Sequence, residues 1–82
     1  DELGTPKLRA KDINWVSGEV PSASFGAMVK VRYTAHPVPA VVTPLAGGDV
    51  EIQFETPARG VTPGQAAVFY VGDEVTGGGF II

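Results

Sequence analysis

The sequence contains no cysteine, which excludes a disulfide framework, a thiolate metal site and a cysteine nucleophile. It also lacks any apolar run approaching the roughly 18 residues of a membrane-spanning helix. Its first residues do not have the pattern of a signal peptide. Nothing here points to a secreted, disulfide-stapled or membrane-bound protein, and we expect a cytoplasmic one.

Long stretches free of helix-breaking residues are missing as well. Glycine occurs 11 times and proline 7 times among 82 residues, so no window is long enough to predict a stable helix. Apolar residues make up 44% of the chain and charged residues 18%, which is typical of a folded globular protein. A chain of this length closes one hydrophobic core. We therefore predict a single all-β domain.

The clearest strand signal lies at residues 25–33, where every second residue is apolar. The residues that share this apolar face are Phe25, Ala27, Val29, Val31 and Tyr33. Because successive side chains of a strand point to opposite sides, Lys30 and Arg32 should project away from the core.

Further strand patterns, together with residues 25–33, predict a six-stranded barrel. They lie at residues 11–17, 40–45, 50–54, 66–71 and 74–82. Residues 46–49 contain two glycines and have the length of a hairpin turn. Residues 66–71 are apolar on both faces, as expected of a strand covered by the rest of a barrel or by a neighbouring domain. Closing a small, mainly antiparallel sheet removes its exposed edges, so we predict a closed or nearly closed β-barrel over residues 11–82, with residues 1–10 as a linker.

A type II turn is predicted at residues 62–65, with Pro63 in its second position and Gly64 in its third. The turn should hold Gln65 in a defined place, where its amide can donate and accept hydrogen bonds. A glutamine beside a turn is also ordinary polar surface, so the residues alone leave both interpretations open.

Residues suited to catalysis are few and scattered. His36 is the one histidine, and neither a serine and acid partner nor metal-ligand spacing accompanies it. Glu51 and Glu55 fall on the wet face of the predicted hairpin and Asp73 in a turn, as solvated surface charges do. Glycines 77–79 precede Phe-Ile-Ile rather than a Lys-Ser or Lys-Thr pair and a helix, so they predict a bulge or a close backbone approach. We predict no catalytic residue and no metal site.

The chain as a whole is not basic. Its formal net charge is −3, whereas a free-standing nucleic-acid-binding module usually carries a basic face. An arginine beside an aromatic ring, as at Arg32 and Tyr33, nevertheless suits a phosphate and an unpaired base. The competing interpretation is that Tyr33, in phase with the apolar residues, packs in the core and that the basic residues form an ordinary polar face.

Three blocks of the sequence resemble the C-terminal barrel domain of the bacterial tRNA 2-thiouridylase family, in that family's order and spacing. They are KDINWVSGE at 11–19, KVRY at 30–33 followed by PVPA at 37–40, and VTPGQAAVFY at 61–70 continuing through GGGFI. The blocks cover nearly everything from residue 11 to the end of the sequence.

The resemblance implies that an ATP-binding PP-loop domain and a central domain precede this barrel, which is similar to barrels of elongation factor Tu and of aminomethyltransferases. In the family, ATP with Mg²⁺ activates the wobble uridine of tRNA by adenylation. Persulfide sulfur on a cysteine, supplied through a sulfur-relay protein, then replaces the 2-oxygen. Without a cysteine or a PP-loop, this chain is implied to be a non-catalytic part of a tRNA-uridine 2-sulfurtransferase, with no cofactor of its own.

The resemblance also implies contact with the anticodon region of tRNA. The family's contact residues match Arg32, Tyr33 and Gln65, and Lys30 is a further basic residue of the same block. Many relatives carry another basic residue after the Arg-Tyr pair, where this chain has Thr34, so one phosphate contact is expected to be missing. Two alternatives stay open: a purely structural barrel that packs on the catalytic and central domains, and an interaction module like those of translation factors.

Overall fold

The computed structural model of the chain describes residues 5–31, 36–58 and 63–82. Its strands are β1 Thr5–Trp15, β2 Phe25–Val31, β3 Val38–Pro44, β4 Val50–Ala58, β5 Ala66–Val71 and β6 Glu74–Ile81. A short 3₁₀ turn, η1 Ala46–Gly48, joins β3 to β4. Within the described ranges no helix has the length and apolarity needed to cross a membrane.

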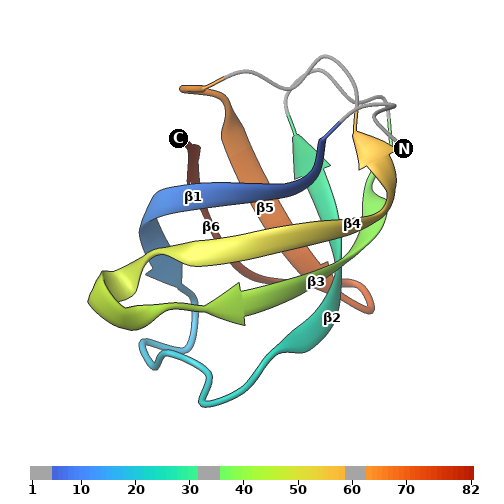
Figure 1. Ribbon diagram of the computed structural model, residues 1–82. Coiled ribbons are helices and arrows are strands. Elements are labelled where there is room, and N and C mark those ends of the chain that lie inside the picture. Colours follow the sequence, from blue (N-terminus) through green and yellow to red (C-terminus); the bar gives the residue numbers. More distant parts are fainter. Residues whose placement is uncertain (1–4, 32–35, 59–62) are drawn as a thin grey trace.

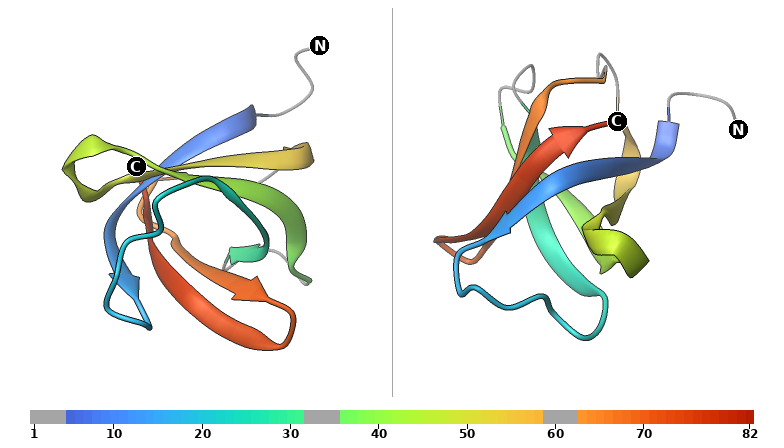
Figure 2. Two further views of the ribbon diagram at one scale, coloured as in Figure 1. Left: turned by 90° about the horizontal axis from the view of Figure 1, so that it is seen from below. Right: turned by 90° about the vertical axis from the view of Figure 1, so that its left-hand side faces the viewer.

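The strands form a closed barrel in the order β1-β4-β3-β2-β5-β6, and β6 pairs back onto β1. Every neighbouring pair is antiparallel. In Figure 1 the strands β1, β4 and β3 cross in front of β5 and β6, and the two views of Figure 2 show the strands wrapped around one interior. The predicted all-β, six-stranded closed barrel is confirmed.

The core is formed by the inward-facing residues, which alternate with outward-facing ones along each strand. In β2, for example, Val29 and Val31 are buried while Met28 and Lys30 are exposed, as the period-two pattern predicts. Buried apolar side chains from the strands fill the interior: Ala10, Ala27, Val29, Val31, Ala40, Val42, Val50, Ile52, Phe54, Ala67, Phe69 and Ile81.

Strand β1 begins earlier than the sequence indicates, at Thr5 rather than near residue 11. Residues 7–10 pair with β4, so β1 takes in part of the 1–10 stretch for which a linker is predicted. Lys7 and Arg9 are exposed, whereas Ala10 is fully buried. Leu8 and Ala10 alternate with basic residues here, but two apolar residues are too few to mark a strand by pattern alone.

A β-bulge in β1 changes which residues face the interior. The pairing of β1 with β6 shifts between Lys11 and Asn14, and Asp12 adopts a left-handed backbone with φ of 55°. As a result Ile13 and Trp15 pack against the core, in addition to the residues before the bulge. The Trp15 ring lies with its centroid 5.9 Å from that of Phe25 and 6.0 Å from that of Phe69.

Two glycine-dependent turns fix the neighbouring strands. At the β3–β4 hairpin, Gly47 and Gly48 have φ of 91° and 96°, and the Leu45 N–H donates to the Asp49 carbonyl at 2.8 Å. Gly64 has φ of 92°, as the third position of the predicted type II turn requires, although Thr62 lies outside the described residues.

Candidate nucleic-acid interface

Lys30 lies on the outer surface of the barrel. Its side chain is exposed, and across the sheet its partner is Val68 of β5. The prediction that Lys30 projects away from the core is confirmed. Among the described residues, the ion pair that the structure shows joins Arg9 to Asp49 at 3.6 Å, on a different part of the surface. The Lys30 ammonium therefore faces solvent, where a phosphate can reach it.

Gln65 has a defined place, as the turn pattern predicts, and hydrogen bonds to the last strand hold it there. The Gly64 N–H donates to the Ile81 carbonyl at 2.7 Å, and the Ile81 N–H donates to the Gln65 carbonyl at 2.8 Å. The Gln65 side chain is only 9% exposed, so most of it lies inside the barrel rather than on the surface. Val31, at the end of β2, pairs with Ala67, so Gln65 and the end of β2 share one end of the barrel.

Arg32, Tyr33 and Thr34 lie outside the described residues. Their place relative to Lys30 and Gln65 therefore stays a prediction from the resemblance.

Most of the residues considered for catalysis are exposed, and Glu51 is half-buried. His36 and Glu55 are exposed, and Asp73 lies in the exposed turn between β5 and β6. In the described part of the chain, no three His, Cys, Asp or Glu side chains come together in a way that could hold a metal ion. These groups fit the interpretation of solvated surface residues.

Glycines 77–79 are a site of close backbone approach, as predicted. A Cβ atom added at Gly77 would stand 2.9 Å from the Asn14 carbonyl oxygen, and one at Gly79 would stand 2.5 Å from the Lys11 carbonyl oxygen. The register shift of this hairpin falls elsewhere, between Phe69 and Tyr70. Since the triplet is part of β6 and paired on both sides, it is not a phosphate-binding loop.

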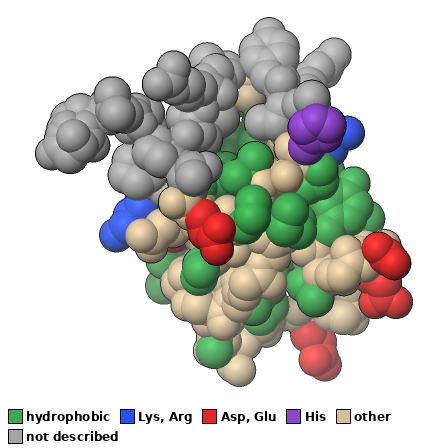
Figure 3. Space-filling view, turned by 90° about the vertical axis from the view of Figure 1, so that its right-hand side faces the viewer, with side chains coloured by type: hydrophobic (Ala, Val, Ile, Leu, Met, Phe, Trp, Pro, Cys, Tyr) green, Lys and Arg blue, Asp and Glu red, His purple; other side chains and the backbone are tan. Residues whose placement is uncertain are grey.

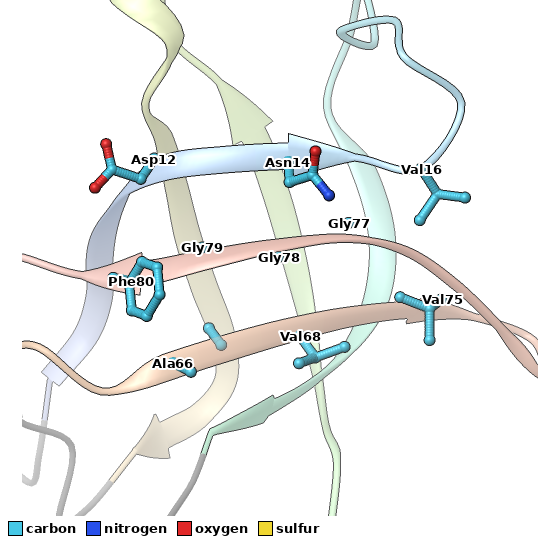
Figure 4. Close-up of a pocket in the computed structure, with 11 residues that line it drawn as sticks. Asp12, Asn14, Val16, Ala66, Val68, Val75, Gly77, Gly78, Gly79 and Phe80 are labelled. Atoms are coloured by element: carbon cyan, nitrogen blue, oxygen red, sulfur yellow. The ribbon is translucent and has the colours of Figure 1, made fainter.

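The middle glycine leaves a groove on the outer surface. Gly78 pairs with Asn14 of β1 on one side and with Val68 of β5 on the other, and it has no side chain to fill the space between them. Figure 4 shows Phe80 at one end of this groove and Val75 near the other. Sequence reasoning missed the groove. Its signal is the triplet itself: Gly77 and Gly79 face the interior, and Gly78 faces outward, where an added Cβ would stand 2.6 Å from the Ala67 carbonyl oxygen.

A second apolar surface covers β2, β3 and β5. Met28 is 37% exposed and Val41 43%, and Pro39 and Tyr70 lie beside them. Figure 3 shows one side of the barrel on which hydrophobic side chains gather, with acidic side chains around them and the histidine at the margin. The outer as well as the inner side of β5 is therefore apolar, as its sequence predicts.

Comparison with known proteins identifies the barrel. The profile of the aminomethyltransferase beta-barrel domain family matches residues 5–81. The chain is 51% identical over 79 residues to the tRNA-specific 2-thiouridylase MnmA of Geobacillus thermodenitrificans, covering 96% of this chain and 21% of that protein. It is 49% identical over 81 residues to the same-named protein of Geobacter metallireducens, covering 99% of this chain and 22% of that protein.

A further relative, the tRNA-specific 2-thiouridylase MnmA of Magnetococcus marinus, is 46% identical over 82 residues, which is 100% of this chain and 23% of that protein. The chain thus spans about a fifth of the length of the curated relatives it matches. The resemblance carried by the three sequence blocks is confirmed over almost the whole chain. The chain therefore belongs to the aminomethyltransferase beta-barrel domain family, in the form of that barrel which tRNA-specific 2-thiouridylases contain.

Proposed function

We propose that this barrel is the tRNA-contacting and tRNA-positioning domain of a tRNA-specific 2-thiouridylase. The whole protein would catalyse ATP-dependent 2-thiolation of the wobble uridine in the cytoplasm. The observation that carries the proposal is the 51% identity, over 96% of the chain, to a protein of that name.

The chemistry itself belongs to parts of the protein outside this barrel. We assign ATP and Mg²⁺ to those parts as well, since the glycine triplet of the barrel is paired within a strand and does not form a phosphate-binding loop. We assign adenylation, sulfur transfer and contact with a sulfur-relay protein to the other domains. The barrel contributes by holding the anticodon region of the tRNA in a fixed orientation.

The contact residues are proposed to have unequal roles. Lys30, exposed on β2, and Arg32, which follows this strand, would bind phosphates, and Tyr33 would stack on a base. Gln65 reaches the RNA only through the small exposed part of its side chain, so we expect it to contribute less than the basic residues.

The test is salt-dependent tRNA binding by the full-length 2-thiouridylase that contains this barrel. Lys30→Ala and Arg32→Ala should each weaken binding and lower the slope of log affinity against log salt by about one phosphate contact. Lys7→Ala is the matched control, because Lys7 is exposed on β1 beside β4, away from β2. An unchanged affinity and slope for both test variants would contradict the proposed role.

A purely structural barrel is the second candidate, and the apolar outer surface formed by Met28, Pro39, Val41 and Tyr70 favours it. In that case this surface packs on the catalytic and central domains and the barrel does not touch RNA. An anticodon stem-loop added to the intact enzyme would then leave the amide resonances of Lys30 and Gln65 undisturbed.

A further inference from the structure

The groove over Gly78 has the chemical features of a site for a nucleobase. We propose that it binds one unpaired base of the RNA, with Phe80 as the stacking surface. This inference rests on the proposed function for the source of the RNA, and it extends the contact surface from Lys30 across β5 and β6 to β1, where the resemblance indicates no contact residue.

The aromatic ring at the end of the groove is accessible. Phe80 is 46% exposed and projects from the outer side of β6, next to the groove that Gly78 opens (Figure 4). Every base has a π face, so an exposed aromatic side chain on a sheet is a stacking surface that does not depend on the sequence of the RNA. Within the groove Gly78 offers only backbone, so a flat ring meets no side chain there.

Hydrogen-bonding groups stand on the β1 side of the groove, next to the apolar Val16, and the β5 side is apolar. Asp12 and Asn14, both exposed, come from β1, whereas Val68 comes from β5 (Figure 4). The Asn14 amide can donate to and accept from a base edge, and the Asp12 carboxylate can accept from an exocyclic amino group. Hydrogen-bonding side chains opposite an apolar one suit a nucleobase, which has polar edges and apolar faces. They suit a purely apolar protein side chain less well.

The charges beside the groove suit the RNA backbone. Lys11 pairs with Phe80 across β1 and β6, and Lys30 pairs with Val68 across β2 and β5. Cross-strand partners have Cβ atoms about 5 Å apart, so an exposed ammonium group flanks the groove on each side. Phosphates on both sides of an inserted base would meet these two lysines. The Asp12 carboxylate also lines the groove, so two lysines stand there against one aspartate, whereas Glu55 is the charged residue among those described as lining the other apolar surface.

The experiment titrates the 82-residue chain, which closes its own barrel around its own core, and follows the amide resonances by NMR. The probes are a seven-nucleotide single-stranded RNA of mixed sequence and the same strand annealed to its complement. We expect the single strand to shift the amides of Asn14, Val68, Gly78 and Phe80, and the duplex to leave them in place, because its bases are paired.

Variants of Phe80 separate base stacking from apolar docking. Phe80→Leu keeps an apolar side chain but loses the π face, so it should weaken single-strand binding about tenfold or more, and Phe80→Trp should restore it. Val41→Ala, at a similarly exposed apolar position on β3, should bind like the original chain. Dispersed amide spectra verify that each variant is folded.

Two results would overturn the inference. Equal binding by Phe80→Leu and the original chain would mean that the groove is an apolar docking surface for protein. If the single strand leaves the amide resonances of the groove residues unshifted, no base enters the groove. Neither result touches the proposed function, because that function stands or falls on the salt dependence of Lys30→Ala and Arg32→Ala in the full-length enzyme.

Discussion

At the residue scale, the β6 glycines differ sharply from other glycines in what a side chain would meet. A Cβ atom at Gly79 would press on the Ile13 side chain and on the Lys11 carbonyl oxygen, which is backbone and cannot turn aside. At Gly26 the same atom would enter open space.

We therefore expect Gly79→Ala to lower the free energy of unfolding by about 1–3 kcal/mol, the usual range for overpacking. Gly26→Ala should leave it unchanged or raise it by about 0.5 kcal/mol, because alanine restricts the unfolded chain. Urea denaturation measures both values. Equal losses at the two positions would show that close packing against β1 is not what requires glycine in β6.

The sequence is informative about single residues only where a local pattern decides their environment. The exposure of Lys30, for example, follows from alternation within one strand. The burial of Gln65 and the open groove beside Phe80 could not be predicted. The groove depends on the pairing of β6 with β1, which lies far away along the chain, and the burial of Gln65 depends on the closed barrel around it.

At the element scale, the bulge in β1 can be tested through its one unusual backbone angle. Asp12 has φ of 55°, a region that costs most residues about 1–2 kcal/mol and glycine nothing. Asp12→Gly should therefore raise the melting temperature or leave it unchanged, Asp12→Asn should be nearly neutral, and Asp12→Val should lower it by several degrees. If Asp12→Val and Asp12→Gly have the same melting temperature, Asp12 does not adopt the left-handed conformation in solution.

Elements with strong local patterns were predicted more accurately than elements that depend on pairing. The predicted strand at residues 66–71 matches β5 in both bounds, because a continuous apolar run between two turns marks its ends. The prediction for β1 missed its first residues and its bulge. The bulge adds one residue to β1 and so changes which residues face inward. Ile13 and Trp15 therefore face the core, which the sequence pattern alone does not predict.

At the scale of the whole molecule, Trp15 reports on the closure of the barrel. Its ring contacts Phe25 of β2 and Phe69 of β5, so one fluorescent side chain depends on three strands. We expect its fluorescence and the far-ultraviolet circular dichroism to change together at one urea midpoint, as in a two-state transition. An earlier fluorescence midpoint would show that this end of the barrel opens before the sheet is lost.

The pairing of β6 with β1 also has a consequence for the newly made chain. A ribosome releases β1 well before β6, so one edge of β1 stays without its strand partner until the last strand emerges. Long-range closure of this kind is slow, and an open strand edge invites addition of another chain. Lys7, Arg9 and Lys11 line the outer side of β1, and such charges discourage that addition. We therefore expect these basic residues to protect the newly made barrel from aggregation.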